Sequence, residues 1–309
     1  MIWYVQGNLF QSPAQTLVNT VNTVGVMGKG VALEFKRLFP EMYAQYRDLC
    51  ERGQFKVGQL WLYKSPQKWV LNFPTKEHWR QPSRVEYVEA GLRKFVEVYS
   101  EWGIHSIAFP PLGCGNGQLD FATQVRPLME RYLRNLPIDV FIYPHIGRTF
   151  VEHLDAAAME AWLHSEPSSL PFTEVWRDLE AALSQKSEFR TQEGHPFTAR
   201  ITSERIEVNT EGKTQVFDYE TLLAFWQQLR TLGFSMSRIA PGLDRELAYL
   251  IPIFSELPYV APVRVSEQYQ TLRHNATLGV QFVPAAQRPG EPRAMQLALF
   301  SEGNAWQTG

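Results

Sequence analysis

"VNTVNTVGVMGKGVALEF", residues 18–35, decides the expected fold, because a strand-like run passes there into a helical pattern across a glycine-rich loop. Asn19 and Asn22 lie where the strand is expected to end. The loop glycines are Gly25, Gly28 and Gly30. Backbone N–H groups at such a loop and helix start bind phosphate, glycine lets the ligand approach, and Lys29 adds positive charge. The stretch therefore predicts an anion site, with an ordinary strand–helix turn as the alternative.

This loop matches neither of two common nucleotide-binding patterns. Gly30 follows Lys29 at the place where a Walker A loop has the hydroxyl residue that holds magnesium. The dinucleotide-binding spacing G-x-G-x-x-G is also absent from the stretch. An anion bound here is therefore expected to be held in some other way.

A second glycine-rich loop, "PPLGCGNGQLD" at residues 110–120, follows another strand-like run. Its glycines are Gly113, Gly115 and Gly117. Ligands of open α/β sheets bind at the carboxyl ends of the strands, so the two loops are expected at one edge. Two anion loops suit a diphosphate, while Asn8 and Asn22 suit hydroxyl or amide groups. A nucleoside diphosphate sugar fits this set of groups.

A third stretch, "NFPTKEHWR" at residues 72–80, places Lys76 just beyond a buried strand. Such a lysine is usually a solvated end charge, but a partly desolvated one has a lowered pKa and acts as a nucleophile or an acid–base group. Our hypothesis for His78, Trp79 and Arg80 is contact with DNA, with Trp79 stacking on a base and Arg80 on phosphate. The alternative is that Trp79 covers the core and Arg80 is solvated.

The first 145 or so residues alternate between strand and helix patterns, which predicts an α/β domain. The strands are expected at 2–6, 16–22, 59–63, 69–73, 104–110 and 138–143. The helices are expected at 31–52, with a break at Pro40, at 84–102, and within 121–135. Only residues 64–68 separate two of the strands, so an antiparallel hairpin within a mixed sheet is expected.

The pattern changes after residue 150, and a second domain is expected beyond a linker at 151–170. Residues 171–285 predict a smaller α+β domain, for which a winged-helix-like arrangement is one candidate. Its expected helices are 174–184, 219–231 and about 243–254, and its expected strands are 198–202, 205–208 and 214–217. Residues 286–309 are expected to form a flexible tail, in which the apolar residues 297–300 are a candidate docking motif.

Composition limits the class of protein. The net charge of -2 argues against a broad nucleic-acid-coating surface, although it leaves room for a local basic site. The two cysteines form no disulfide or metal pattern and the seven histidines have no metal-like spacing, so no metal or other cofactor is expected. The chain lacks a signal-peptide pattern and an apolar run of about 20 residues, which predicts a cytoplasmic protein that does not enter a membrane.

Together these stretches resemble the macrodomain of DNA ADP-ribosyl glycohydrolases, the DarG-type antitoxins. The resemblance rests on "GNL" at 7–9, "LVNTVNTVGVMGKGVALEFK" at 17–36, "NFPTKEHWR" at 72–80, "EAGL" at 89–92 and "PPLGCGNGQLD" at 110–120. It covers residues 1 to about 145 and implies a three-layer α/β/α fold, with a domain assigned to 1–150. The implied reaction is hydrolysis of the N-glycosidic link between ADP-ribose and thymine in single-stranded DNA.

The resemblance also implies roles for individual residues. Lys76 and Asn22 would be catalytic, Asn22 by fixing the hydroxyls of the distal ribose, while Asn8 and Leu9 would hold the adenosine end. The residues implied to line the ribose and wrap the diphosphate are Asn19, Thr20, Val21, Asn22, Gly28, Lys29, Gly30, Val31, Ala32, Leu33, Glu34, Thr75, Leu112, Gly113, Cys114, Gly115, Asn116 and Gly117.

Two positions depart from related macrodomains. Many have an aspartate where Asn8 stands, although an asparagine can still accept from the adenine amino group. Related terminal ADP-ribose glycohydrolases pair their lysine with an aspartate in the last glycine loop, where this chain has Gly117. Asp120 is expected to cap the next helix instead. Lys76 is therefore expected to act without a general-base partner, either through a Schiff-base-like adduct or as a proton donor and electrostatic group.

For the second domain, the resemblance implies binding of a partner toxin, a DNA ADP-ribosyltransferase. The alternative is a DNA-binding or autoregulatory domain, but residues 219–230 carry little charge, which argues against direct DNA readout. For the whole chain, two other functions remain open. One is an ADP-ribose reader without turnover, and the other is a hydrolase of ADP-ribosylated protein or ADP-ribose esters.

Overall fold

The computed structural model describes residues 1–145, 156–236, 243, 246–265 and 277–283. The expected tail, residues 286–309, lies outside the described residues. The chain divides into two compact units. The first contains Met1–His164 and Ser169–Arg177, and the second contains Ser165–Ser168 and Asp178–Gly309. Along the chain, the division passes between residues 164 and 165 and between 168 and 169, inside the linker expected at 151–170, and again between 177 and 178, within a helix. The linker stays a prediction.

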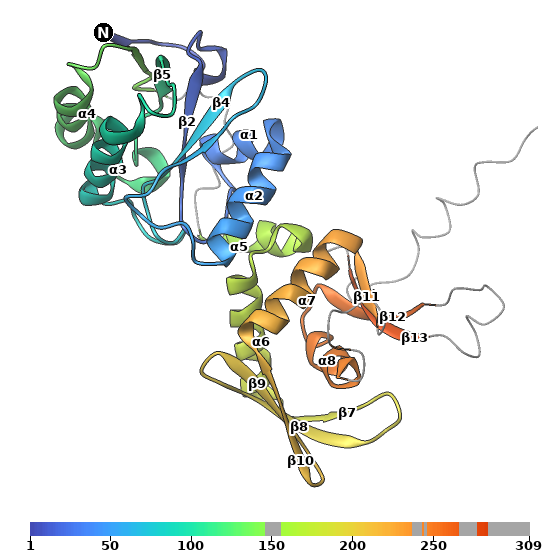
Figure 1. Ribbon diagram of the computed structural model, residues 1–309. Coiled ribbons are helices and arrows are strands. Elements are labelled where there is room, and N and C mark those ends of the chain that lie inside the picture. Colours follow the sequence, from blue (N-terminus) through green and yellow to red (C-terminus); the bar gives the residue numbers. More distant parts are fainter. Residues whose placement is uncertain (146–155, 237–242, 244–245, 266–276, 284–309) are drawn as a thin grey trace, which may run out of the picture. The chain divides into compact units, whose positions relative to one another are not determined.

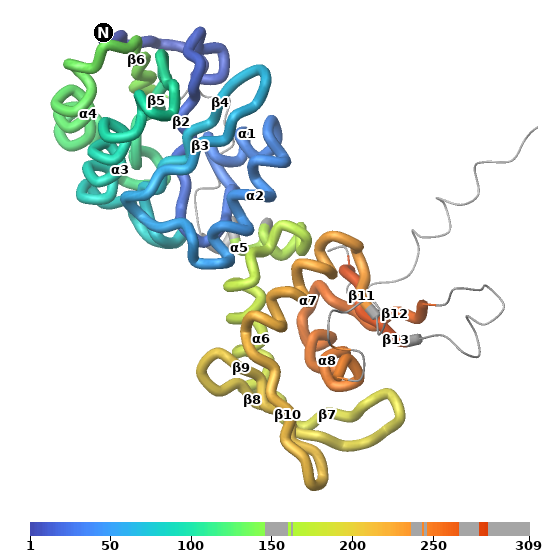
Figure 2. Tube along the Cα trace, in the orientation of Figure 1, coloured from blue at the N-terminus to red at the C-terminus, as the bar shows by residue number. Residues whose placement is uncertain are grey.

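A six-stranded mixed sheet forms the centre of the first unit (Figures 1 and 2). Its order is β1-β6-β5-β2-β4-β3. The strands are β1 (Ile2–Tyr4), β2 (Thr16–Val21), β3 (Trp61–Tyr63), β4 (Trp69–Pro74), β5 (Ser106–Phe109) and β6 (Asp139–Ile142). All neighbours pair in parallel except β3 and β4, which form the predicted antiparallel hairpin. The sequence-based prediction of a mixed sheet is confirmed.

Helices cover both faces of this sheet and produce the three-layer architecture. They are α1 (Gly30–Leu38), α2 (Pro40–Glu51), α3 (Val85–Val98) and α4 (Arg126–Leu133). A further helix, α5 (Ala156–Ser165), follows later in the chain. Side chains of α1 and α2 pack into one core cluster, whereas those of α3 and α4 pack into another. Because both faces are covered, β2 and β4 are almost entirely buried.

Local sequence explains where these helices begin and end. Pro40 starts α2, because proline suits the first helical turn but interrupts a helix interior, so the expected 31–52 helix is two helices. Asp120 accepts a hydrogen bond from the Thr123 N–H at 2.7 Å, which confirms its predicted capping role. The capped segment is a short π-helical turn, η3 (Phe121–Val125), that leads into α4.

The second unit is α+β, as expected, and contains two antiparallel sheets. One sheet has the order β10-β9-β8-β7, formed by β7 (Glu188–Arg190), β8 (Pro196–Thr202), β9 (Arg205–Thr210) and β10 (Lys213–Asp218). The other has the order β11-β13-β12, formed by β11 (Phe234–Met236), β12 (Val260–Val265) and β13 (Thr277–Phe282). The second sheet was not predicted from the sequence. The winged-helix-like arrangement stays a hypothesis.

The second unit also contains α7 (Tyr219–Leu232) and α8 (Leu247–Phe254), while α6 (Phe172–Gln185) crosses the boundary between the units. Asp218 caps α7 by accepting from the Thr221 N–H at 2.7 Å, and Gly233 ends it with a φ of 78°. Most of the large apolar side chains of α7 are buried, namely Leu222, Leu223, Phe225, Trp226 and Leu229. This helix therefore forms core structure, in keeping with its low charge.

Candidate functional site

Three neighbouring strands, β5, β2 and β4, end at the same edge of the sheet because they run parallel. The loops that follow them contain the three stretches singled out in the sequence. The pocket at this edge is lined by Thr20, Val21, Asn22, Val26, Gly28, Lys29, Gly30, Val31, Ala32, Thr75, Lys76, Trp79, Ser83, Pro111, Gly113, Cys114, Asn116 and Gly117. The prediction that the two glycine loops meet at one site is therefore confirmed by the geometry.

The two glycine loops approach each other closely in the pocket. A Cβ added at Gly30, which has a φ of 53°, would lie 3.4 Å from the Asn116 Nδ2 atom. Gly113 has a φ of 70° and Gly115 a φ of 65°, conformations that glycine adopts readily. Gly30 also begins α1, so the unpaired N–H groups of the first helical turn lie at the same edge. This arrangement suits a diphosphate held between two loops.

Lys76 is the one ammonium group of the 72–80 stretch, and it lies in the pocket. Its Nζ donates a hydrogen bond to the backbone carbonyl oxygen of Asn116 at 3.0 Å. Burial, together with the nearby Lys29 ammonium, lowers the pKa of Lys76 to about 8. Within the described part of the chain no carboxylate forms an ion pair with Lys76. The lysine is therefore partly desolvated, as the chemical interpretation of the sequence requires.

Gly117 shows why no aspartate assists Lys76 from this loop. A Cβ at residue 117 would lie 2.3 Å from the Ser83 Oγ and 2.8 Å from the Ser83 Cβ. Ser83 is held in place because its N–H donates to the Gly117 carbonyl oxygen at 2.9 Å and its Oγ donates to the Thr75 Oγ1 at 3.2 Å. The space that an aspartate would need is therefore occupied by Ser83, a pocket residue that sequence reasoning missed.

Asn22 lines the pocket, but its side-chain amide is used by its own loop. Its Nδ2 donates to the Val26 carbonyl oxygen at 2.7 Å, and its Oδ1 accepts from the N–H groups of Val24 at 3.1 Å and Val26 at 3.2 Å. The Tyr46 hydroxyl donates to the Asn22 carbonyl oxygen at 2.7 Å. These contacts fix the shape of the loop, and a catalytic role for Asn22 stays a prediction.

Several predicted ligand-binding residues do not line the pocket. Asn8 accepts from the Phe10 N–H at 3.0 Å and caps the short helix η1 (Leu9–Gln11), whose Leu9 is buried. Asn19 is fully buried and donates to the Asn72 Oδ1 at 2.9 Å across β2 and β4. The others outside the lining are Leu33, Glu34, Leu112 and Gly115. Glu34 instead forms an ion pair with Arg37 at 3.6 Å.

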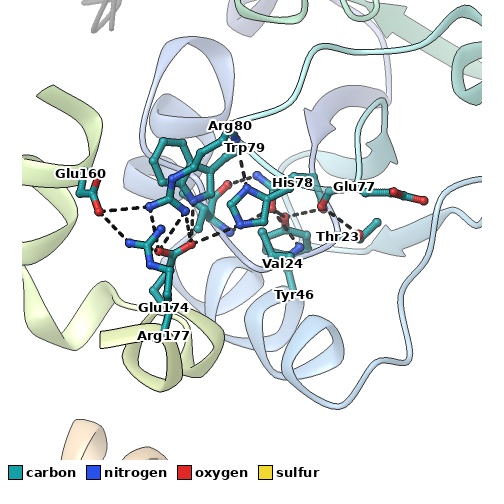
Figure 3. A network of polar contacts seen from close by, with 12 residues as sticks. Thr23, Val24, Tyr46, Glu77, His78, Trp79, Arg80, Glu160, Glu174 and Arg177 are labelled. Atoms are coloured by element: carbon teal, nitrogen blue, oxygen red, sulfur yellow. Dashed lines mark hydrogen bonds and ion pairs between the residues drawn. The ribbon is translucent and has the colours of Figure 1, made fainter. Parts of the chain in front are cut away.

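His78, Trp79 and Arg80 are held by Glu174, at the start of α6 and within the same unit (Figure 3). Trp79 is only 8% exposed and also lines the pocket. The burial of Trp79 favours the alternative in which it covers the core, whereas Arg80 is ion-paired rather than simply solvated. Contact between these residues and DNA stays a prediction.

Cys114 lies in the pocket as a neutral thiol. Burial, with a smaller contribution from Asp120, raises the pKa of this thiol to about 12. A thiol with this pKa is a poor nucleophile at neutral pH, which favours a packing role for Cys114. Among the described residues, no group of three or more His, Cys, Asp or Glu side chains could hold a metal ion.

Comparison with known proteins agrees with this geometry. Residues 18–127 match the family model described as the Macro domain. The first unit is a macrodomain. The chain is 49% identical over 148 residues to the DNA ADP-ribosyl glycohydrolase of Thermus aquaticus, an alignment that spans 46% of this chain and 41% of that protein. It is 44% identical over 151 residues to the enzyme of the same name from Mycobacterium tuberculosis, across 48% of this chain and 43% of that protein.

Two further relatives extend the comparison. A DNA ADP-ribosyl transferase–DNA ADP-ribosyl glycohydrolase fusion protein of Thermosipho africanus is 43% identical over 158 residues, across 45% of this chain and 40% of that protein. The solved macrodomain of Thermus aquaticus DarG is 49% identical, with a TM-score of 0.45, covering 47% of this chain and 99% of that structure. The chain thus spans less than half the length of these curated relatives, and its macrodomain resembles theirs as the sequence predicted.

No helix in the described ranges is both long enough and apolar enough to cross a membrane.

Proposed function

We propose that this protein hydrolyses the N-glycosidic link between ADP-ribose and thymine in single-stranded DNA. The observation that carries the proposal is the partly desolvated Lys76, placed between two glycine loops in a macrodomain. The relatives at 43–49% identity, which are named DNA ADP-ribosyl glycohydrolases or a fusion that includes one, support the choice of reaction. The names of these relatives and the geometry of the pocket thus support the same class of substrate.

ADP-ribose would be held by backbone groups rather than by a cluster of charged side chains. The Gly28–Lys29–Gly30 loop and the first turn of α1 would bind the diphosphate from one side, and the loop with Gly113 and Gly117 from the other. The distal ribose would then lie beside Thr20 and Thr75, which line the same pocket. In this pose its anomeric carbon faces Lys76.

Hydrolysis breaks the bond between the anomeric carbon and the thymine nitrogen, adds water to the carbon and returns a proton to the base. In one route the protonated Lys76 donates that proton or stabilises the departing base. In the other route the neutral amine attacks the anomeric carbon after ring opening, the base leaves, and water hydrolyses the resulting iminium. A pKa of about 8 leaves about a tenth of Lys76 neutral at pH 7, so both forms are available.

The reaction would reverse the product of a DNA ADP-ribosyltransferase, and we propose that the chain acts as the antitoxin to such an enzyme. The fusion of transferase and glycohydrolase in one Thermosipho africanus protein supports this pairing. We assign toxin binding to residues 171–285, because α7 in that region carries little charge and packs apolar side chains into the core, which argues against DNA readout by this helix.

Activity is tested by incubating the protein with an ADP-ribosylated thymidine oligonucleotide, an ADP-ribosylated protein and free ADP-ribose. Release of ADP-ribose from the oligonucleotide supports the proposal. Binding of ADP-ribose without release from either polymer identifies a reader, and release from protein alone identifies a protein hydrolase. Toxin binding is tested by capturing the purified transferase with residues 171–285 and, separately, with residues 1–150. Capture by the first domain alone overturns the assignment.

A further inference from the structure

The segment between Lys76 and Ser83 forms one wall of the pocket without belonging to a helix or strand. Lys76, Trp79 and Ser83 all line the pocket. A loop can hold reacting groups accurately only when surrounding contacts fix it, because misplacement by about 1 Å can slow a reaction about 100-fold. The contacts that fix this segment therefore bear on the chemistry.

The two ends of the segment are fixed by neighbouring loops of the macrodomain. The Glu77 carbonyl oxygen accepts hydrogen bonds from the Thr23 N–H and the Thr23 Oγ1, each at 3.0 Å. At the other end, Ser83 bonds to Gly117 and Thr75. These anchors all lie within residues 18–127, the region of the family match.

The middle of the segment is fixed by Glu174, which lies outside that region. The Glu174 carboxylate accepts from the Trp79 Nε1 at 3.1 Å and forms an ion pair with the Arg80 guanidinium at 2.8 Å. It also contacts the His78 Nε2 at 3.3 Å and the Arg177 guanidinium at 3.0 Å. Figure 3 shows the side chains of all three loop residues converging on this carboxylate.

Glu174 is only 2% exposed, so its charge depends on these partners. A buried carboxylate without donors is strongly unfavourable, whereas one that accepts several charged hydrogen bonds is stable. Arg80 and Arg177 also reach Glu160, at 3.3 and 2.7 Å, so two guanidinium groups balance two carboxylates. The formal charges of these four side chains therefore cancel, and removal of Glu174 takes one carboxylate partner from both Arg80 and Arg177.

Trp79 connects this cluster to the pocket. Its ring lies against the Arg80 guanidinium, 3.9 Å from carbon to ring centroid, and stacks on the His78 ring at 5.7 Å between centroids. The indole N–H points to Glu174, which defines the rotation of the ring. Since the same ring lines the pocket with Lys76, the position of that wall depends on Glu174.

We propose that Glu174 is a positioning residue of the ADP-ribose site, which fixes Trp79 as the pocket wall beside Lys76 through the cluster with Arg80 and His78. The start of α6, distant in sequence from the family match, is therefore part of the site. The effect on turnover rests on the proposed function, but the effects on the segment and on the pocket wall do not.

The test compares full-length wild-type protein with Glu174→Gln, using Glu193→Gln as the matched control because Glu193 lies exposed in the second unit. Amide hydrogen exchange of residues 77–83 is measured first, well below the melting temperature of each variant. The affinity for ADP-ribose and the single-turnover rate on the ADP-ribosylated oligonucleotide follow. Since glutamine keeps the shape of glutamate but not its charge, this variant separates the contribution of the ion pairs from the contribution of side-chain packing.

We expect faster exchange in residues 77–83 for Glu174→Gln, a turnover rate lower by about 10- to 100-fold, and an ADP-ribose affinity within a few-fold of wild type. Trp79→Phe, which removes the indole N–H and keeps a ring, should slow turnover and should not add its full effect to that of Glu174→Gln. Unchanged exchange together with a wild-type rate overturns the proposal, and so do strictly additive effects.

If Glu174→Gln does not fold, Arg177→Gln removes one partner of the cluster at a half-exposed position and is judged by the same measurements. If the wild-type protein releases no ADP-ribose from the oligonucleotide, the proposed function fails. The positioning role is then decided by amide exchange in residues 77–83 alone: faster exchange in Glu174→Gln supports it, and unchanged exchange overturns it.

Discussion

Lys76 and Asn116 are joined by a hydrogen bond of 3.0 Å from the lysine ammonium to the backbone carbonyl oxygen. This bond directs the ammonium across the pocket toward the second glycine loop. The carbonyl oxygen is neutral and remains an acceptor at any pH, so it orients the lysine without acting as a base. The protonation state of Lys76 is then set by burial and by Lys29.

Replacement of Lys76 by alanine should abolish turnover and retain ADP-ribose binding, because the diphosphate would be held by backbone groups. Loss of a positioned proton donor or nucleophile typically lowers rates by about 100- to 10,000-fold. Single-turnover kinetics and calorimetric binding measure the two effects separately. Lys56→Ala, at an exposed position outside the pocket, is the control. Turnover that survives in Lys76→Ala excludes both mechanistic routes.

Gly117→Ala should weaken the site, because the added Cβ would overlap Ser83, 2.3 Å from its Oγ. Ser83 cannot move without losing its hydrogen bonds to Gly117 and Thr75. We expect a lower affinity for ADP-ribose and a destabilisation of about 1–3 kcal/mol in chemical denaturation. Gly117→Asp should behave in the same way and should not create a lysine–aspartate dyad with higher activity.

The matched variant for this prediction is Ser83→Gly combined with Gly117→Ala. It removes the Oγ and Cβ that meet the new methyl group, so it should recover stability relative to Gly117→Ala. Wild-type stability in the Gly117→Ala single variant would show that Ser83 does not fill this space in solution.

Gly91→Ala should destabilise the fold, even though alanine is usually about 1 kcal/mol better than glycine in a helix. Gly91 lies in α3 against Phe73, and a Cβ there would be 2.2 Å from the Phe73 Cζ. The Phe73 ring is fully buried, so overpacking should cost about 1–3 kcal/mol. Adding Phe73→Leu should reverse part of the loss. A Gly91→Ala variant more stable than wild type contradicts the packing seen here.

Much of the macrodomain could be predicted from the sequence, because its strands, helices and glycine loops each leave a pattern in consecutive residues. Buried parallel strands such as β5 and β6 are largely apolar without alternation, and the glycine loops and Lys76 directly follow strands that the sequence reveals. The three-stranded sheet of the second unit was missed, because β12 contains Pro262 and Arg264 and pairs with a strand beyond residue 276. Ser83 and Glu174 carry no local signal either, since their roles depend on contacts formed only in the fold.

Glu174 illustrates this limit most clearly, since 94 residues separate it from Arg80. In the sequence, Arg80 follows a tryptophan and suggests nucleic-acid contact. In the fold, the same side chain neutralises a buried carboxylate. A prediction of exposed DNA contacts from such a motif requires knowledge of the acidic partners that the rest of the chain supplies.

The Glu174 cluster should make the fold sensitive to acid. Burial alone would raise the pKa of the Glu174 carboxyl, but hydrogen bonds from His78 and Arg80 outweigh it and hold the pKa at about 2, below the ordinary 4.5. A lowered folded-state pKa stabilises the fold above about pH 4.5, and that contribution is lost as the pH falls toward 2. It is on the order of 3 kcal/mol.

Denaturation midpoints measured between pH 7 and pH 3 should therefore fall less steeply for Glu174→Gln than for wild type, because glutamine does not titrate. Glu193→Gln, whose side chain is exposed, should follow the wild-type curve. Identical pH dependence in wild type and Glu174→Gln would mean that contacts in the folded state do not lower the pKa of the Glu174 carboxyl.

The pH dependence of kcat/KM should distinguish the two routes open to Lys76, because they require opposite protonation states. If the ammonium donates a proton, activity is present below the pKa of about 8 and is lost as the pH rises through it. If the amine attacks the anomeric carbon, activity rises as the pH approaches 8 and levels off above it. Because Lys29 lowers the pKa of Lys76, Lys29→Met should move either inflection to higher pH.

Borohydride provides an independent measurement for the same choice. It reduces an iminium to a stable amine, so the nucleophilic route predicts a covalent ADP-ribose adduct on Lys76 by mass spectrometry, with loss of activity. The proton-donor route predicts no adduct and full activity after the reagent is removed. Lys29 is also an amine in the pocket. An adduct on Lys29 instead of Lys76 would show that Lys29 is the nucleophile and that our assignment to Lys76 is wrong.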